Sequence, residues 1–192
     1  MILSVAQAYF LAHGYAGTTM SGIAAEVGGS KGTLWNHFPS KEELFTAVLL
    51  RATRAHRDHL AQILDPCGEL APTLHRLCVS LLKKVTSVEA IALNRLIISE
   101  GARFPEMSRI FFDLAPYHTR ARIAEFLEGA MDRRQIREAD PLDAAHALMA
   151  ITLAGCHQQL LTGQMQEVSP AQIERDAVFA VDIFLRAYAP MS

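Results

Sequence analysis

The sequence predicts an all-α protein with a small N-terminal head, residues 1–46, and a larger helical body, residues 47–192. No segment alternates apolar and polar residues with the period of two that marks a strand. Glycine and proline cluster before residue 40 and then do not occur until Pro66, so short segments precede long ones. With 192 residues, 51% of them apolar and 20% charged, the chain can bury a substantial core.

The head is predicted to hold three short helices, over residues 2–13, 20–27 and 31–37. Gly14 closes the first helix, Pro39 follows the third, and Gly28 supplies a turn that needs a positive φ. Ser30 is the expected N-cap of the third helix. Two helices joined by a short glycine-containing turn form a helix-turn-helix. Its expected apolar contacts are Ile23, Ala24, Val27, Leu34 and Phe38.

The third helix of such a motif enters the major groove of DNA. Its side chains offer base or phosphate contacts: a lysine for a phosphate or guanine, a threonine for a base or thymine methyl, and an indole N–H for a phosphate. Lys41, at the start of the fourth helix, is expected to bind a phosphate. The predicted DNA-contacting set is Thr19, Ser30, Lys31, Gly32, Thr33, Trp35, Asn36, His37 and Lys41.

The charge of the head argues against tight DNA binding. Residues 1–50 contain two lysines and three glutamates, which gives a net charge of −1, and the whole chain carries −2. Few phosphate contacts predict modest affinity and a shallow dependence on salt.

Helix-start signals recur through the body. Ser40 to Glu43 form a capping box, Asp140-Pro141 place an N-cap before a proline, and Ser169-Pro170 do the same. A stripe through Ile173, Ala177, Val181, Phe184 and Tyr188 predicts a last helix that Val178, Ile183 and Leu185 make apolar on more than one face. A helix with two apolar faces needs two partners, so we expect a homodimer. The predicted interface comprises Met149, Leu153, Leu160, Val178, Val181 and Leu185.

An aromatic segment with Pro116 inside it is the candidate wall of a ligand pocket. The candidate lining is Phe104, Met107, Phe111, Phe112, Tyr117, His118, Met149, Thr152, Cys156 and His157. Plain core packing explains about half of these equally well. His56 and His59 are interpreted as a solvated helix face rather than metal ligands, Cys156 as an inert buried sulfur, and Arg95 with Glu100 as a structural ion pair.

The head and part of the body resemble the tetracycline-repressor (TetR) family of bacterial transcriptional regulators. The resemblance covers Phe10 to Met20, Ile23-Ala24 and Ser30 to Phe45, and Arg95 to Glu100 with Phe104 to Glu106 resemble its AefR-like subgroup. It implies a homodimer that binds an operator in double-stranded DNA and is released by a small-molecule effector. Trp35 stands where the family usually has tyrosine, and Gly29 where it has an aliphatic or small residue. The family's basic arm before the first helix has no counterpart here, so either DNA is bound without one or the true start lies upstream.

Three function classes compete on the residues. The leading hypothesis is a ligand-responsive repressor, with a small apolar or aromatic effector, in the bacterial cytoplasm. The second is a DNA- or partner-binding helical protein without an effector. An enzyme is the third, disfavoured because no phosphate loop, di-iron Glu-x-x-His pair or nucleophile elbow is present. We expect no cofactor, no metal, no signal peptide and no membrane segment.

Overall fold

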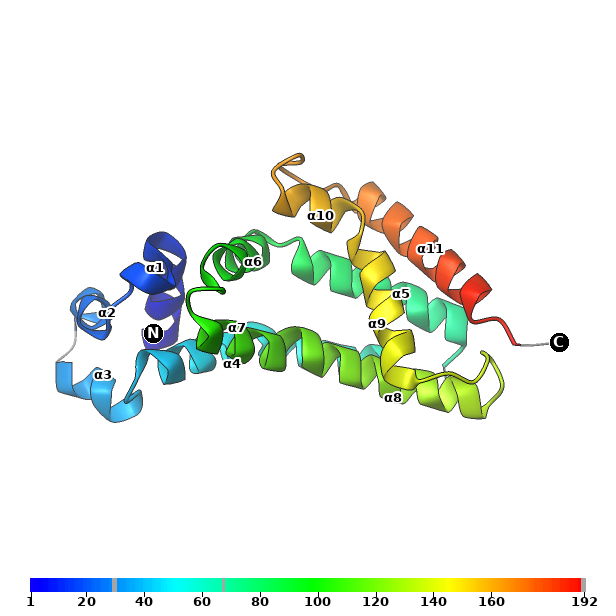
Figure 1. The fold of residues 1–192 in the computed structure, drawn as a ribbon, viewed down its shortest axis with the longest axis horizontal. Coiled ribbons are helices and arrows are strands. Elements are labelled where there is room, and N and C mark those ends of the chain that lie inside the picture. Colours follow the sequence, from blue (N-terminus) through cyan, green and yellow to red (C-terminus); the bar gives the residue numbers. More distant parts are fainter. Residues whose placement is uncertain (29–30, 67, 191–192) are drawn as a thin grey trace. The chain divides into compact units, whose positions relative to one another are not determined.

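The computed structural model describes residues 1–28, 31–66 and 68–190, without the side chains of Lys31 and Thr33, and every regular element in these ranges is a helix (Figure 1). The all-α prediction is therefore confirmed. The helices are α1 (Ile2–Gly17), α2 (Met20–Val27), α3 (Lys31–His37), α4 (Lys41–Ile63), α5 (Leu70–Val85), α6 (Val88–Glu100), α7 (Pro105–Phe112), the π-helical turn η1 (Asp113–Tyr117), α8 (His118–Asp132), α9 (Pro141–Leu153), α10 (Cys156–Leu161) and α11 (Pro170–Ala187).

The helices form two compact units. The first comprises Met1–Ala55 with Ala92–Pro116, and the second comprises His56–Ile91 with Tyr117–Ser192. Compared with the predicted head, the first unit also includes residues 47–55 of α4, most of α6, all of α7 and residues 113–116 of η1. Helices α4 and α6 contribute residues to both units.

The head has the predicted helix-turn-helix. The expected second and third helices match α2 and α3, and Ile23 and Leu34 are buried between them and the rest of the unit. Val27 and Phe38 pack against the same cluster as half-buried residues. α1 continues to Gly17, past the expected end at residue 13. Its backbone nevertheless breaks at Gly14, with φ 72° and ψ 172°, and only one further turn follows.

Gly28 ends α2 in the left-handed conformation, with φ 72° and ψ 15°, and its N–H donates to the Ala25 carbonyl. A Cβ at this position would meet no atom within 4 Å, so only the backbone opposes a side chain. We predict that Gly28→Ala lowers the free energy of unfolding by about 1–2 kcal/mol, because L-residues pay that much in the left-handed region. Gly28→Asn should cost less, since asparagine tolerates this region. Equal melting temperatures for wild type and Gly28→Ala would contradict the assignment.

An aromatic group fills the core of the first unit. Phe10 and Phe45 meet edge to face, with ring centroids 5.1 Å apart, and Tyr15 lies 5.3 Å from Phe45. All three are almost completely buried. The surrounding cluster takes residues from α1, α2, α3, α4, α6 and α7, so one core fixes the helix-turn-helix to the helices that follow it.

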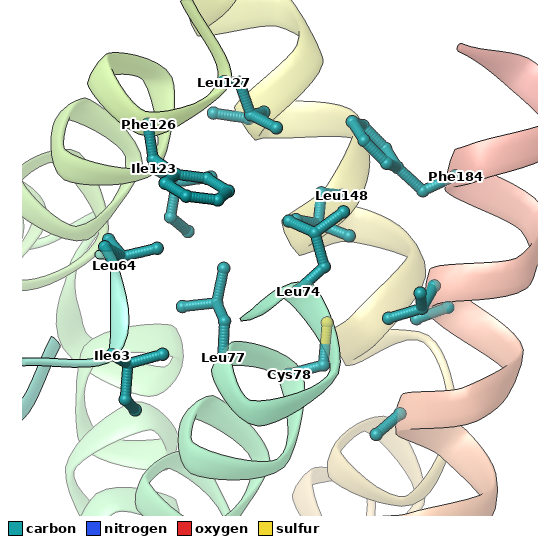
Figure 2. Close-up of a cluster of buried hydrophobic side chains, with 14 of the residues drawn as sticks. Ile63, Leu64, Leu74, Leu77, Cys78, Ile123, Phe126, Leu127, Leu148 and Phe184 are labelled. Carbon is teal, nitrogen blue, oxygen red and sulfur yellow. The ribbon is translucent and has the colours of Figure 1, made fainter. Parts of the chain in front are cut away.

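The second unit is built around α9, which packs against α5, α8 and α11. Figure 2 shows the centre of its core, where Leu77 and Cys78 of α5 lie near Ile123 of α8 and Leu148 of α9. Phe184 of α11 is fully buried and stacks on Tyr188 at 4.5 Å. The predicted stripe of α11 is confirmed, since Ile173, Ala177, Val181 and Phe184 are all buried.

The predicted helix starts are also confirmed. Ser40 Oγ accepts from the Glu43 N–H at 3.1 Å, Asp140 Oδ1 from the Asp143 N–H at 2.9 Å, and Ser169 Oγ from the Gln172 N–H at 3.2 Å. The expected irregularity at Pro116 takes the form of the π-helical turn η1 between α7 and α8. A proline has no N–H for the helical ladder, and a wider turn accommodates its missing bond.

Candidate DNA-binding site

Helix α3, the predicted DNA-recognition helix, has an exposed polar face and one buried apolar residue that packs against the core. Leu34 is 3% exposed and fixes the helix to the core, whereas Gly32, Trp35, Asn36 and His37 are exposed. This is the division that the sequence predicts. Gly29, Ser30 and the side chains of Lys31 and Thr33 lie outside the described residues.

Thr19 has a structural role beside its predicted contact with DNA. Its Oγ1 accepts a hydrogen bond from the Gly22 N–H at 3.0 Å and so caps α2. The hydroxyl proton is not used in that bond, and Thr19 is exposed. A capping threonine of this kind can still donate its proton to a phosphate oxygen.

The ammonium of Lys41 binds the end of α1. Its Nζ donates to the Tyr15 carbonyl at 2.8 Å and to the Thr18 carbonyl at 3.3 Å, and it lies 4.2 Å from the Tyr15 ring centroid. The sequence predicts a phosphate contact for this charge. The internal role has no signal in the sequence, because only the fold brings the carbonyls of Tyr15 and Thr18 to Lys41.

Tyr15 links α1 to the start of α4. Its hydroxyl donates to Glu42 Oε1 at 3.1 Å. Burial, followed by the nearby Glu42 charge, raises the pKa of Tyr15 far above its usual range. Hydrogen bonding, first from the Glu42 backbone and then from Tyr15 and Ser40, lowers the pKa of Glu42 despite partial burial. Tyr15 therefore stays a neutral donor and Glu42 a charged acceptor at neutral pH.

Glu100 also binds α1. Its Oε1 accepts from the Tyr15 N–H at 3.2 Å and its Oε2 from the Ala16 N–H at 2.7 Å. Beside the pair with Arg95 that the sequence predicts, Glu100 thus binds backbone groups that lie 84 and 85 residues back along the chain.

The structure divides the predicted pocket residues between the two units. Phe104, Met107 and Phe111 belong to or pack against the core of the first unit, with Met107 fully buried and Phe104 5.2 Å from Tyr15. Phe112 and Tyr117, by contrast, are more than half exposed. Core packing therefore accounts for the apolar character of Phe104, Met107 and Phe111.

The remaining pocket candidates lie in the second unit. Thr152 is buried and donates to the Leu148 carbonyl at 2.7 Å, while Met149 packs against the core as a half-buried residue. His157 is 8% exposed, and burial lowers its pKa, so it is neutral at pH 7. Burial and then the Arg57 and Arg122 charges lower the pKa of His118.

His56 is half-buried instead of solvated, which corrects the prediction for this histidine. Its Nε2 is buried without a hydrogen bond to any described residue. Burial, together with the charges of Lys84 and His59, lowers its pKa to about 4. The described residues contain no group of three or more His, Cys, Asp or Glu that could hold a metal ion.

Two cysteines of the second unit are buried and unreactive in character. Burial raises the pKa of Cys78 to about 11, and burial with the Asp176 carboxylate raises that of Cys156 to about 12. Thiolates react and thiols do not. We therefore predict that native Cys67→Ser protein shows no fast reaction with a thiol reagent at pH 8 and two reactive thiols in denaturant. Fast labelling of the folded variant would contradict this.

The predicted interface residues differ in exposure. Leu160 and Val181 are buried within the protomer, and Met149, Leu153 and Leu185 are half-buried. Val178 is 52% exposed, and its neighbour Phe179, which is not among the predicted interface residues, is 60% exposed. Phe179 lies outside the apolar stripe of α11 that is buried in the protomer. A large apolar residue outside a buried stripe is the sequence signal that could have identified it.

Two family models cover most of the chain. Residues 2–48 match the tetR family of bacterial regulatory proteins, and residues 72–190 match the C-terminal domain of AefR-like transcriptional repressors. The chain belongs to the TetR family. The family resemblance inferred from the sequence is thereby confirmed in both halves.

Individual TetR-family proteins are similar over most of the chain. The structure of a TetR-family regulator from Mesorhizobium loti is 29% identical, with a TM-score of 0.84 and coverage of 97% of this chain and 94% of that one. The flavonoid-responsive regulator FrrA is 28% identical, with a TM-score of 0.82 and coverage of 100% and 96%. An uncharacterized HTH-type regulator of Mycobacterium bovis is 28% identical over 72% of this chain, and the match spans 65% of that relative's length.

None of these relatives is described as an enzyme; all are described as regulators. Among the described residues, no helix has the length and apolar character needed to cross a membrane.

Proposed function

We propose that this protein is a cytoplasmic transcriptional repressor that binds a palindromic operator as a homodimer and releases it when a small apolar or aromatic effector binds. The observation that carries the proposal is the exposed polar face of α3, held by the buried Leu34, in a chain of the TetR family. The regulator class of its relatives supports a regulatory role.

DNA contact is assigned to the exposed face of α3 and to its neighbours. Trp35, Asn36 and His37 face solvent, and Gly32 allows close approach of the backbone to the groove. Lys31, Thr33 and Ser30 stay in the set on sequence grounds. Thr19 donates its free hydroxyl proton to a phosphate. The Lys41 N–H, in the first turn of α4, is the phosphate donor there, while its ammonium holds α1.

The proposed contact surface for the second copy of the chain is formed by the exposed apolar residues of α11. Val178 and Phe179 are adjacent and both more than half exposed, and contiguous apolar surface is a mark of an interaction site. The half-buried Met149, Leu153 and Leu185 are further proposed interface residues, and Leu160 and Val181 support them from the core.

The test of the dimer is the mass of the protein in solution. Phe179→Glu should convert the dimer into a monomer in sedimentation experiments, because a charge would be buried without a partner. The matched control is Ala171→Glu, which adds the same charge at an exposed position in the first turn of the same helix and should remain dimeric. A dimeric Phe179→Glu would show that another surface is used.

The proposed effector site lies in the second unit, where the buried polar residues Thr152 and His157 belong to α9 and α10. The ring nitrogens of His157 are buried and make no hydrogen bond of good geometry with a described residue, so a ligand that accepts or donates one there gains affinity. The flavonoid response of FrrA supports an aromatic class of effector. The test is a panel of flavonoids, other phenols and apolar compounds, scored by loss of a DNase footprint on the gene's own upstream region. A footprint that no compound releases would favour a regulator without an effector.

A further inference from the structure

We propose that Glu100 is a positioning residue for DNA reading: its carboxylate, at the end of α6, holds the broken end of α1 and thereby the placement of the helix-turn-helix. The inference rests on the proposed operator binding. All residues involved belong to the first unit.

The end of α1 needs an external acceptor because Gly14 interrupts the helix. With φ 72° and ψ 172°, Gly14 breaks the ladder of backbone hydrogen bonds, and Tyr15 and Ala16 then begin a new turn. The N–H groups at the start of a helical turn have no partner within it. Glu100 supplies one oxygen to each of them, at 3.2 Å and 2.7 Å. Hydrogen bonds of this kind to a charged acceptor are about twice as strong as neutral ones.

Gly14 and Glu100 are fitted to one another. A Cβ on Gly14 would overlap Glu100 Oε1, so any larger residue would displace the carboxylate. A side chain at position 14 would therefore move the Glu100 carboxylate in addition to straining a backbone of positive φ.

Lys41 binds the same segment of the chain with a positive charge. It binds the carbonyls of Tyr15 and Thr18, whereas Glu100 binds the N–H groups of Tyr15 and Ala16. Residues 14–18 are therefore held by an anion from α6 and a cation from α4. The next residue, Thr19, caps α2, so this segment sets where the helix-turn-helix begins.

The test compares Glu100→Gln with Glu89→Gln, an exposed glutamate in the first turn of the same helix. Both substitutions remove one negative charge, and electrostatics alone predicts that both leave operator affinity unchanged or raise it. Glutamine at position 100 keeps the volume but turns an NH₂ group toward one of the two N–H donors. We expect operator Kd to rise by about tenfold for Glu100→Gln, equal to about 1.4 kcal/mol, and not for Glu89→Gln. Both are measured at a temperature where each variant is fully folded.

A second readout needs no DNA. In Glu100→Gln the Tyr15 and Ala16 amides should exchange hydrogen faster than in wild type, and the emission of Trp35 in α3 should shift, while the amides of α8 and α9 stay unchanged. A merely stabilising role would lower the melting temperature but leave operator Kd and Trp35 emission as in wild type. That outcome would overturn the proposal. Absence of specific DNA binding by wild type would instead count against the proposed function, and the exchange and emission data would still decide the role of Glu100.

Discussion

Replacing Gly32 with glutamate should weaken operator binding by about 100- to 1000-fold while the protein stays folded. Gly32 is exposed on α3, so a side chain there costs little packing. In the complex, however, the new carboxylate would face the phosphate backbone, and like charges at an interface cost several kcal/mol. The measurement is a fluorescence titration with duplex DNA, using the single tryptophan of the chain, Trp35, as the reporter.

Two controls separate shape from charge. Gly32→Ala should stabilise the fold by up to about 1 kcal/mol, because alanine favours a helix over glycine, yet it should still weaken DNA binding. Gln62→Glu adds the same charge at an exposed position of α4 in the second unit and should leave operator Kd nearly unchanged. If Gly32→Glu binds the operator like wild type, α3 does not enter the groove.

Phe45→Ala should lower the free energy of unfolding by about 3–5 kcal/mol, the cost of removing a buried aromatic ring from a packed core. Phe45 is 1% exposed and contacts both Phe10 and Tyr15. Because one cluster holds the whole first unit together, operator binding should be lost at temperatures where the second unit is still helical.

The check on Phe45→Ala is denaturant unfolding followed by Trp35 fluorescence, which reports on the first unit, and by circular dichroism, which reports on all helices. Leu50→Ala is the matched control, since Leu50 lies on the same helix and is 41% exposed. Its effect should stay below about 1 kcal/mol. An equal loss in both variants would show that the aromatic cluster is not the core of the head.

The helix-turn-helix and the helix starts of the body were predictable because local signals determine them. Gly28 marks a left-handed turn, Ser40 and Ser169 are N-caps with their donor partners three residues on, and Leu34 and Phe38 lie four residues apart, at helical spacing. Each of these features involves residues only a few positions apart, so the amino-acid sequence alone is enough to identify it.

The contacts of Lys41 and Glu100 were not predictable in the same way. Each side chain binds backbone atoms of α1, and Glu100 does so across 84 or more residues. Backbone groups carry no residue identity, so no pattern of side chains indicates them. The same limit applies to Phe104 and Met107, whose aromatic and thioether character suggested a pocket and whose burial belongs to the core of the first unit.

Operator reading by α3 is tested most directly by binding of the purified full chain to its own gene's upstream DNA, followed by Trp35 fluorescence over a salt series and compared with a scrambled duplex. We predict saturable binding that the scrambled duplex does not compete for and a symmetric footprint with half-sites one or more turns apart. The salt slope should be shallow, because the head carries only two lysines against three glutamates. Equal affinity for both duplexes, or no change in Trp35 emission at saturating DNA, would contradict the claim that α3 reads an operator.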